Sequence, residues 1–179
     1  MSEALRVLIT AQQIHRRIQE IGAQIDADYP EGRLHLVCIL KGACFFLADL
    51  ARAIRRETYI DFIGISSYGK NKSSSGQVKL TRDLDHIVEG AHVLVVEDIV
   101  DSGVTLSYLA DVLQQRRPRS LRIATLLDKP GRRKQPVDVA YVGFQIPDEF
   151  VVGYGLDYAE KYRNLPEICV LETSAEAAP

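Results

Sequence analysis

The chain has 179 residues, of which 46% are hydrophobic and 26% are charged, with 12 glycines and 7 prolines. This composition is typical of one compact globular domain and excludes a fibrous or disordered chain. A domain of this length buries roughly 70% of the surface that its unfolded chain exposes, so it needs neither disulfides nor a structural metal. The formal net charge of −2 provides no general attraction for nucleic acid or anionic lipid, so any anion site must be local.

No apolar run approaches the roughly 18 residues of a membrane-spanning helix, and charge interrupts the apolar start of the chain. We therefore expect a cytoplasmic enzyme or binding protein without a membrane partner. Cys38, Cys44 and Cys169 are an odd number without a CxxC pair, and they lie in apolar runs, so buried reduced thiols are expected. The four histidines show no metal-ligand spacing and are expected at surface or strand-edge positions.

Hydrophobic periodicity defines the expected elements. Thr10 with Gln13 three residues later is typical of a helix N-terminus, and isoleucines recur at helical spacing from Ile14 to Ile25. The apolar run from Leu34 to Leu40 predicts a strand that ends at a tight loop. Further along the chain, similar patterns predict helices over 43–54 and 106–115, strands over 59–65, 78–80, 92–96 and 121–127, and a mobile Gly- and Ser-rich loop over 66–76.

Strands that alternate with helical patterns predict an α/β fold with a mainly parallel central sheet flanked by helices. Ligands in such a fold collect at the carboxyl ends of the strands. Beyond Pro136 the pattern changes to short strands and turns, and residues 172–179 have the composition of a frayed tail. No internal repeat or linker divides the chain, so residues 1–179 are expected to form one domain.

The segment from Glu97 to Thr105 places three carboxylates and a Ser-Gly-Val-Thr turn between a buried strand and a helix start. Backbone N–H groups and hydroxyls from Ser102 onward can face one phosphate at the helix N-terminus, where Gly103 allows close approach. Glu97 and Asp98 cannot hold a phosphate, but they suit ribose hydroxyls or a hydrated Mg²⁺. A sugar phosphate satisfies both halves. Simple helix capping by an acid or serine is the alternative, and the density of features disfavours it.

The sequence VVEDIVDSGVT at 95–105 resembles the phosphoribosyl-diphosphate motif of the type I phosphoribosyltransferases, in particular their hypoxanthine-guanine branch. Similarity extends from about Leu34 to Leu171 and includes four further motifs in the same order. The resemblance implies the type I fold, with a small hood of short strands from the chain ends. Val104 stands where mammalian relatives often have a lysine, which indicates the bacterial form. The further motifs are LKG at 40–42, SSYG at 66–69, LLDKP at 126–130 and DEFVVGYGLDYAEKYRNLP at 148–166.

The resemblance implies Mg²⁺-dependent transfer of a 5-phosphoribosyl group from phosphoribosyl diphosphate to N9 of hypoxanthine or guanine. The products are IMP or GMP and pyrophosphate, and the process is purine salvage. A homodimer or homotetramer is also implied. Transferases for xanthine, adenine or orotate are alternatives, of which xanthine is the hardest to exclude. An RNA-binding regulator on the same fold is a further alternative, which the acidic charge balance disfavours.

The matched motifs also imply roles for individual residues. A closing lid keeps water from the cationic sugar, and Mg²⁺ and cationic donors neutralise the leaving diphosphate. The resemblance assigns proton exchange at purine N7 to Asp101; donor binding to Leu40, Lys41, Gly42, Glu97, Asp98, Asp101, Ser102, Gly103, Val104, Thr105 and Arg163; purine binding to Lys129, Phe150, Val151, Leu156 and Asp157; Mg²⁺ coordination to Asp157, Glu97 and Asp98; and the lid to Ser67, Tyr68 and Gly69.

Three of these residues carry the expected chemistry at the base. A general base works best when burial and neighbouring acids raise the pKa of its carboxyl group, and Glu97 and Asp98 are the neighbouring acids in the sequence. Lys129 is implied to donate to the exocyclic O6, which selects 6-oxopurines over adenine. Phe150 is implied to stack on the base, while the Val151 backbone contacts its Watson–Crick edge.

Overall fold

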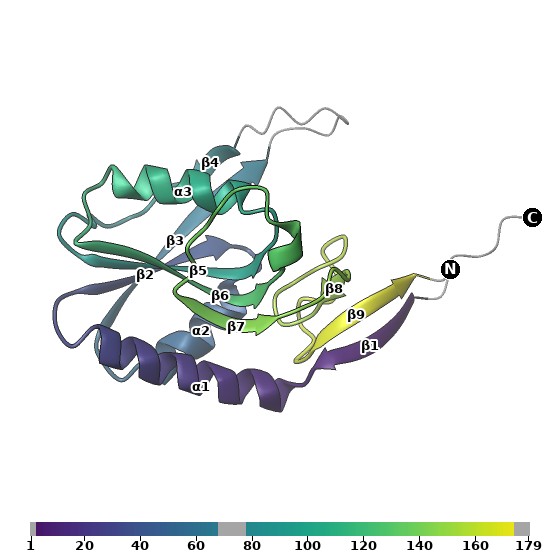
Figure 1. The fold of residues 1–179 in the computed structure, drawn as a ribbon. Helices are drawn as coiled ribbons and strands as arrows, with labels where there is room; N and C mark the ends of the chain where they lie inside the picture. Colours follow the sequence, from purple (N-terminus) through teal and green to yellow (C-terminus); the bar gives the residue numbers. More distant parts are fainter. Residues whose placement is uncertain (1–2, 68–77, 174–179) are drawn as a thin grey trace, which may run out of the picture.

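The computed structural model describes residues 3–67 and 78–173. Its centre is a six-stranded sheet with strand order β4-β3-β2-β5-β6-β7 (Figure 1). All neighbouring pairs are parallel except β3 and β4, which confirms the predicted mainly parallel sheet. The strands are β2 (Leu34–Leu40), β3 (Thr58–Ser67), β4 (Val78–Arg82), β5 (His92–Val100), β6 (Ser120–Asp128) and β7 (Tyr141–Gln145).

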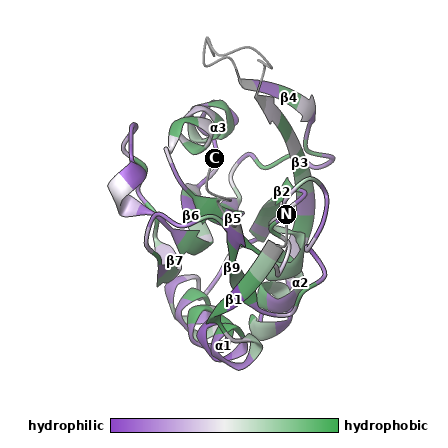
Figure 2. Cartoon of the chain, turned by 90° about the vertical axis from the view of Figure 1, so that its right-hand side faces the viewer, coloured by the Kyte–Doolittle hydropathy of each residue, from purple (hydrophilic) through white to green (hydrophobic). Residues whose placement is uncertain are grey.

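Helices cover both faces of this sheet. α1 (Ala11–Asp28) and α2 (Cys44–Ala53) lie on one face and α3 (Val104–Gln114) on the other (Figure 2). Alternate residues of β5 therefore serve two cores: Leu94 and Val96 join the core with α1 and α2, whereas Val93 and Val95 join the core with α3. Burial on both faces explains why this strand is a continuous apolar run. None of the helices in the described ranges is long and apolar enough to cross a membrane.

The start of α1 follows its sequence signal closely. The Thr10 side chain accepts from the Gln13 backbone N–H, and the Gln13 side chain accepts from the Thr10 backbone N–H at 2.9 Å. This reciprocal cap satisfies two N–H groups that the first helical turn leaves free. The predicted isoleucine stripe, Ile14 to Ile25, is buried against the sheet and α2.

A second, three-stranded sheet lies beyond the carboxyl ends of the main strands, and we call it the hood (Figure 1). Its strands are β1 (Glu3–Ile9), β9 (Ile168–Thr173) and β8 (Val151–Val152), all paired antiparallel, and the name hood also covers the 153–167 connection between β8 and β9. The predicted hood of short strands from the chain ends is confirmed. The predicted tail over 172–179 is wrong for its first two residues, because Glu172 and Thr173 pair with β1.

Three further expectations require correction. Ser66 and Ser67 belong to β3, where they pair with β4, so the predicted loop over 66–76 is wrong for its first two residues. The other predicted lid residues, Tyr68 and Gly69, lie outside the described ranges. His35 is buried at 1% exposure because β2 is an interior strand between β3 and β5. The thiols of all three cysteines are free, but Cys44 at the start of α2 is only partly buried.

Candidate active site

The site is fixed by the point at which the strand order changes direction. β2 leads into α2 on one face, whereas its neighbour β5 leads into α3 on the other face. The carboxyl edge between these two strands is therefore a switch point of the topology, and ligands of open α/β sheets bind at such a point. The Lys41-Gly42 loop and the 97–105 segment lie on either side of it. β6 lies next to β5 and brings Lys129 to the same edge, with the Lys129 backbone N–H bonded to the Val100 carbonyl at 2.9 Å.

Two glycines let three chain segments meet at this edge. A Cβ on Gly42 would lie 1.6 Å from Oδ2 of Asp98, so the loop after β2 touches the acidic pair directly. A Cβ on Gly155 would lie 2.0 Å from the Gly42 carbonyl oxygen, and Gly155 has a φ of +101°. Side chains at these positions would separate the segments. The Leu40–Lys41 peptide bond in this loop is cis.

The 97–105 segment forms a hollow of the predicted kind. β5 ends at Val100, Gly103 turns the chain with a φ of +80°, and α3 begins at Val104. A cavity of about 180 Å³ opens here, at the N-terminus of α3. Free N–H groups and the helix dipole favour an anion at this end of a helix. Its lining consists of Glu97, Ile99, Val100, Asp101, Ser102, Gly103, Thr105 and Leu106.

Glu97 and Asp98 form a partly buried acidic pair. Burial, with the adjacent Asp98 charge, raises the pKa of Glu97 well above its usual range. Burial also raises the pKa of Asp98, although the charge of Arg163 opposes this shift. Such a pair retains a proton more readily than exposed acids, so it can both donate to and accept from the hydroxyls of a sugar.

Asp101 is held by two arginines that the sequence analysis did not single out. Arg132 Nε lies 2.9 Å from Oδ1 of Asp101, and Arg133 donates to the Asp101 carbonyl at 3.0 Å. Arg132 also donates to Asp148 at 3.0 Å. The charged side chain in contact with the Asp101 carboxylate is therefore a cation, Arg132. The sequence had indicated only the acids Glu97 and Asp98 as its charged neighbours. The signal was the Arg-Arg pair one residue after the LLDKP motif, close to the predicted purine-binding residue Lys129.

The predicted purine residues gather between β6 and the hood. Lys129 is 8% exposed, and its Nζ donates to the Glu149 carbonyl at 2.7 Å, immediately before Phe150. The Phe150 ring is 54% exposed, with Tyr158 edge-on at 5.7 Å between centroids, so one aromatic face is available to a base. Val151 and Leu156 are buried behind it.

The 153–167 connection of the hood and the loop after β2 supply the remaining charged residues. Asp157 pairs with Arg163 at 2.8 Å and accepts from the Glu160 backbone N–H at 2.8 Å. Arg163 also donates to the Gly155 carbonyl at 2.7 Å, and Lys41 lies 3.1 Å from the Glu160 carboxylate. The predicted phosphate cations and the predicted metal ligand thus share one network. Glu160, which joins them, was missed because no local pattern distinguishes it from a surface acid.

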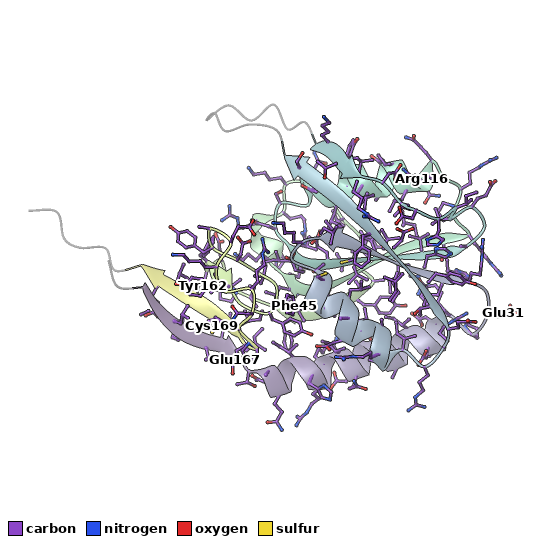
Figure 3. The ribbon with its side chains drawn as sticks, turned by 180° about the vertical axis from the view of Figure 1, so that it is seen from behind. Glu31, Phe45, Arg116, Tyr162, Glu167 and Cys169 are labelled. Carbon is purple, nitrogen blue, oxygen red and sulfur yellow. The ribbon has the colours of Figure 1, made fainter. Side chains whose placement is uncertain are left out.

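Aromatic packing joins the hood to the main sheet. The Phe45 ring at the start of α2 lies 6.2 Å from the Tyr154 ring, and the Tyr154 hydroxyl bonds to the Asp49 carboxylate. Figure 3 shows Phe45 facing the hood that contains Tyr162 and Cys169, with Glu31 at the far end of the molecule. This packing holds the hood over the carboxyl edge of the sheet.

The donor set also fits a magnesium ion that keeps several waters. The described ranges contain no group of three or more His, Cys, Asp or Glu residues able to enclose a metal ion. Mg²⁺ dehydrates reluctantly and needs only one or two carboxylates when a diphosphate supplies further oxygens. Asp157 provides one such carboxylate, and Glu97 and Asp98 provide an acidic pair.

Comparison with known proteins identifies the class. The model of the phosphoribosyl transferase domain matches residues 8–159, and the chain belongs to this family. A hypoxanthine-guanine phosphoribosyltransferase of Bacillus subtilis is 48% identical over 93% of this chain and 93% of its own length. The enzyme of that name from Mycobacterium tuberculosis H37Rv is 54% identical over 93% and 85%. A crystal structure of a hypoxanthine-guanine phosphoribosyltransferase from Bacillus anthracis is 44% identical, covers 96% of this chain and 100% of its own, and has a TM-score of 0.89. The resemblance to the hypoxanthine-guanine branch is confirmed.

Proposed function

We propose that the chain transfers the 5-phosphoribosyl group of phosphoribosyl diphosphate to N9 of hypoxanthine or guanine, with Mg²⁺ as cofactor. Its family makes the chain a phosphoribosyltransferase, and its relatives are enzymes of purine salvage. The observation that carries the more specific proposal is the place of Lys129. It joins the phosphate hollow through the Val100 carbonyl and the exposed face of Phe150 through the Glu149 carbonyl.

Phosphoribosyl diphosphate, the donor, fits between the loop after β2 and the loop after β5. The amides at the start of α3 hold the 5-phosphate, and Glu97 and Asp98 bind the ribose hydroxyls. The Lys41-Gly42 amides and the guanidinium of Arg163 face the diphosphate, for which a planar fork of donors is well suited. When bound, Mg²⁺ neutralises charge on the diphosphate, and Asp157 with the acidic pair would hold it.

The transfer step breaks the bond from the anomeric carbon to diphosphate while N9 of the base bonds to that carbon. Asp101 exchanges a proton at N7, Lys129 donates to O6, and Phe150 stacks on the ring. Adenine carries an amino group in place of O6, so it would set a donor against the Lys129 ammonium. An unpaired buried donor costs about 1–3 kcal/mol, which favours a 6-oxopurine over adenine by about 5- to 150-fold.

The test is an assay of the purified protein with phosphoribosyl diphosphate, Mg²⁺ and each of hypoxanthine, guanine, xanthine and adenine. We expect IMP and GMP, each with one equivalent of pyrophosphate, and loss of both on chelation of the metal. XMP as the main product would move the assignment to a xanthine transferase. Formation of AMP alone, or of no nucleotide, would contradict the proposal.

We also propose a homodimer or homotetramer, a cytoplasmic location and a single domain. Tyr59 and Ile60 on opposite faces of β3, and Phe45 on α2, are each more than 40% exposed, and such exposed large apolar side chains support association. Light scattering coupled to size exclusion measures the mass directly. A monomer at micromolar concentration would contradict the proposed association.

A further inference from the structure

Residues 133–135, which follow Lys129, bind two backbone carbonyl groups of the 97–105 segment. The backbone N–H groups of Lys134 and Gln135 both donate to the Ser102 carbonyl, at 2.8 and 3.1 Å. Arg133 Nη1 donates to the preceding carbonyl, that of Asp101, at 3.0 Å. In a trans peptide the C=O and the following N–H point in opposite directions. Fixing these two carbonyls therefore directs the N–H groups of Ser102 and Gly103 away from the 133–135 segment.

Arg133 is in turn fixed by the central sheet. Its Nη2 pairs with the carboxylate of Asp128, the last residue of β6, and the two side chains are 20% and 8% exposed. Asp128 lies opposite Val100 in the parallel pairing of β6 with β5. The planar guanidinium presents its donors in a rigid fork, so a single side chain can bridge a rigid strand end and a loop carbonyl.

We propose that Arg133, fixed by Asp128, is a positioning residue that orients the Ser102 amide and Asp101 for phosphoribosyl transfer. This inference rests on the proposed function. Arg133 acts through the loop backbone, unlike Arg132, which contacts the Asp101 carboxylate itself and is half-exposed. Loss of the bridge frees the Asp101 carbonyl, so the Ser102 amide is no longer held toward the phosphate with the other amides.

The test uses Arg133→Met together with Asp128→Asn, because the single change would leave a buried carboxylate without its cation. Arg122→Met is the matched control. Arg122 lies on β6, as Asp128 does, and it bridges Asp28 and Tyr141 away from the site. Hydrogen exchange of residues 99–106, the dissociation constant of GMP and kcat are measured for each protein. All values are normalised to the folded fraction.

We expect faster exchange over 99–106 in the double variant, about tenfold weaker GMP binding and a kcat lower by about 10- to 100-fold. Arg133→Lys should fold like the wild type and recover part of kcat, because lysine pairs with Asp128 but lacks the planar fork. The control should retain all three values. A role in stability alone would lower the folded fraction and leave the GMP constant of folded protein unchanged, which would overturn the inference.

Failure of the proposed function can be distinguished from failure of the positioning role. If the wild type makes no nucleotide from any 6-oxopurine, the proposed function fails, and the exchange measurement still decides the positioning role. Unchanged exchange over 99–106 in the double variant would then overturn it, whereas faster exchange would support it.

Discussion

Asp101 combines two requirements that a catalytic carboxylate must meet. It lies in the hollow that suits the donor's phosphate, and it is oriented by cations on its carboxylate and on its carbonyl. A carboxylate in this position can exchange a proton with a base bound between the hollow and Phe150. Its contribution should therefore concern the chemical step more than donor binding.

Replacing Asp101 with asparagine keeps the shape of the side chain but removes its capacity to carry a proton. We expect kcat to fall by about 10²- to 10⁴-fold, the usual contribution of general acid-base catalysis. The dissociation constant of phosphoribosyl diphosphate, measured by calorimetry without a base, should change little. Asp148→Asn removes the other carboxylate on Arg132 and serves as the control, with a smaller loss of kcat. An equal loss of donor affinity in Asp101→Asn would argue against the role.

Lys129 should determine which base is accepted. Lys129→Met keeps the buried methylenes and removes the ammonium, so the bond to O6 is lost. A hydrogen bond to a charged group contributes about 1.5–3 kcal/mol, so kcat/KM for hypoxanthine should fall about 10- to 100-fold. The ratio of kcat/KM for hypoxanthine to kcat/KM for adenine should decrease, as measured in competition assays. Lys134→Met, an exposed lysine nearby, is the matched control; a ratio preserved in Lys129→Met would refute the assignment.

Gly42 and Gly155 are required where the segments around the site meet. Because neither has a side chain, Gly42 can contact Asp98, and Gly155 can contact the Gly42 backbone. These contacts set how closely the loops after β2 and β5 approach, and hence the space that the proposed diphosphate site has between them.

Gly42→Ala should therefore impair donor binding. Its Cβ would overlap Asp98, so the loop after β2 must shift away from the acidic pair. We expect weaker binding of pyrophosphate with Mg²⁺ by tenfold or more, because a displacement of about 1 Å in such a site commonly costs up to 10²-fold. Gly131→Ala is the control, since nothing lies within 4 Å of its added Cβ. Equal pyrophosphate affinity in both variants would show that the contact is not needed.

The elements that the sequence predicted well are those with strong local signals. The α1 cap depends on residues three apart, and the apolar strands β2 and β5 are recognisable as runs. The hood was expected from the family resemblance, whereas no periodicity indicated β1 by itself. Its partner is β9, with Glu3 opposite Thr173, so the pairing depends on contacts across almost the whole chain. Such non-local pairing leaves little trace in a short window.

At the scale of the whole molecule, one buried histidine couples stability to pH. Neither ring nitrogen of His35 has a hydrogen-bond partner in the ranges that the structure describes, and its ring stacks on Tyr59 at 4.9 Å. Burial, with the charges of Arg33 and His86, lowers the pKa of His35 below its usual 6.5. The unfolded chain therefore binds a proton at a higher pH than the folded chain does.

Stability should consequently decrease as the pH falls below about 6.5, because protons favour the state that binds them more readily. The loss amounts to about 1.4 kcal/mol for each unit by which folding lowers the pKa. Urea unfolding between pH 8 and pH 5 measures it, with His35→Phe as the variant that keeps the stacking without a titrating group. His15→Gln, exposed on α1, is the control. Identical pH profiles for wild type and His35→Phe would contradict this prediction.

The site as a whole was predicted only in part. The 97–105 hollow was expected from local chemistry, because acids, glycine and hydroxyls occur together in one segment. Arg133 and Glu160 were not expected, since each acts on a partner distant in sequence: Arg133 on Asp101 and Glu160 on Lys41. A sequence without its fold gives these side chains the properties of ordinary surface charges.

We propose that the 97–105 hollow, the loop after β2 and the hood form one site for phosphoribosyl transfer. A crystal structure of the protein with GMP, pyrophosphate and Mg²⁺ would show whether they do. We expect the 5-phosphate at the amides of Ser102–Thr105, the purine on Phe150 with O6 at Lys129, and pyrophosphate between Gly42 and Arg163. A nucleotide bound elsewhere, or a base out of reach of Lys129, would show that these parts do not form that site.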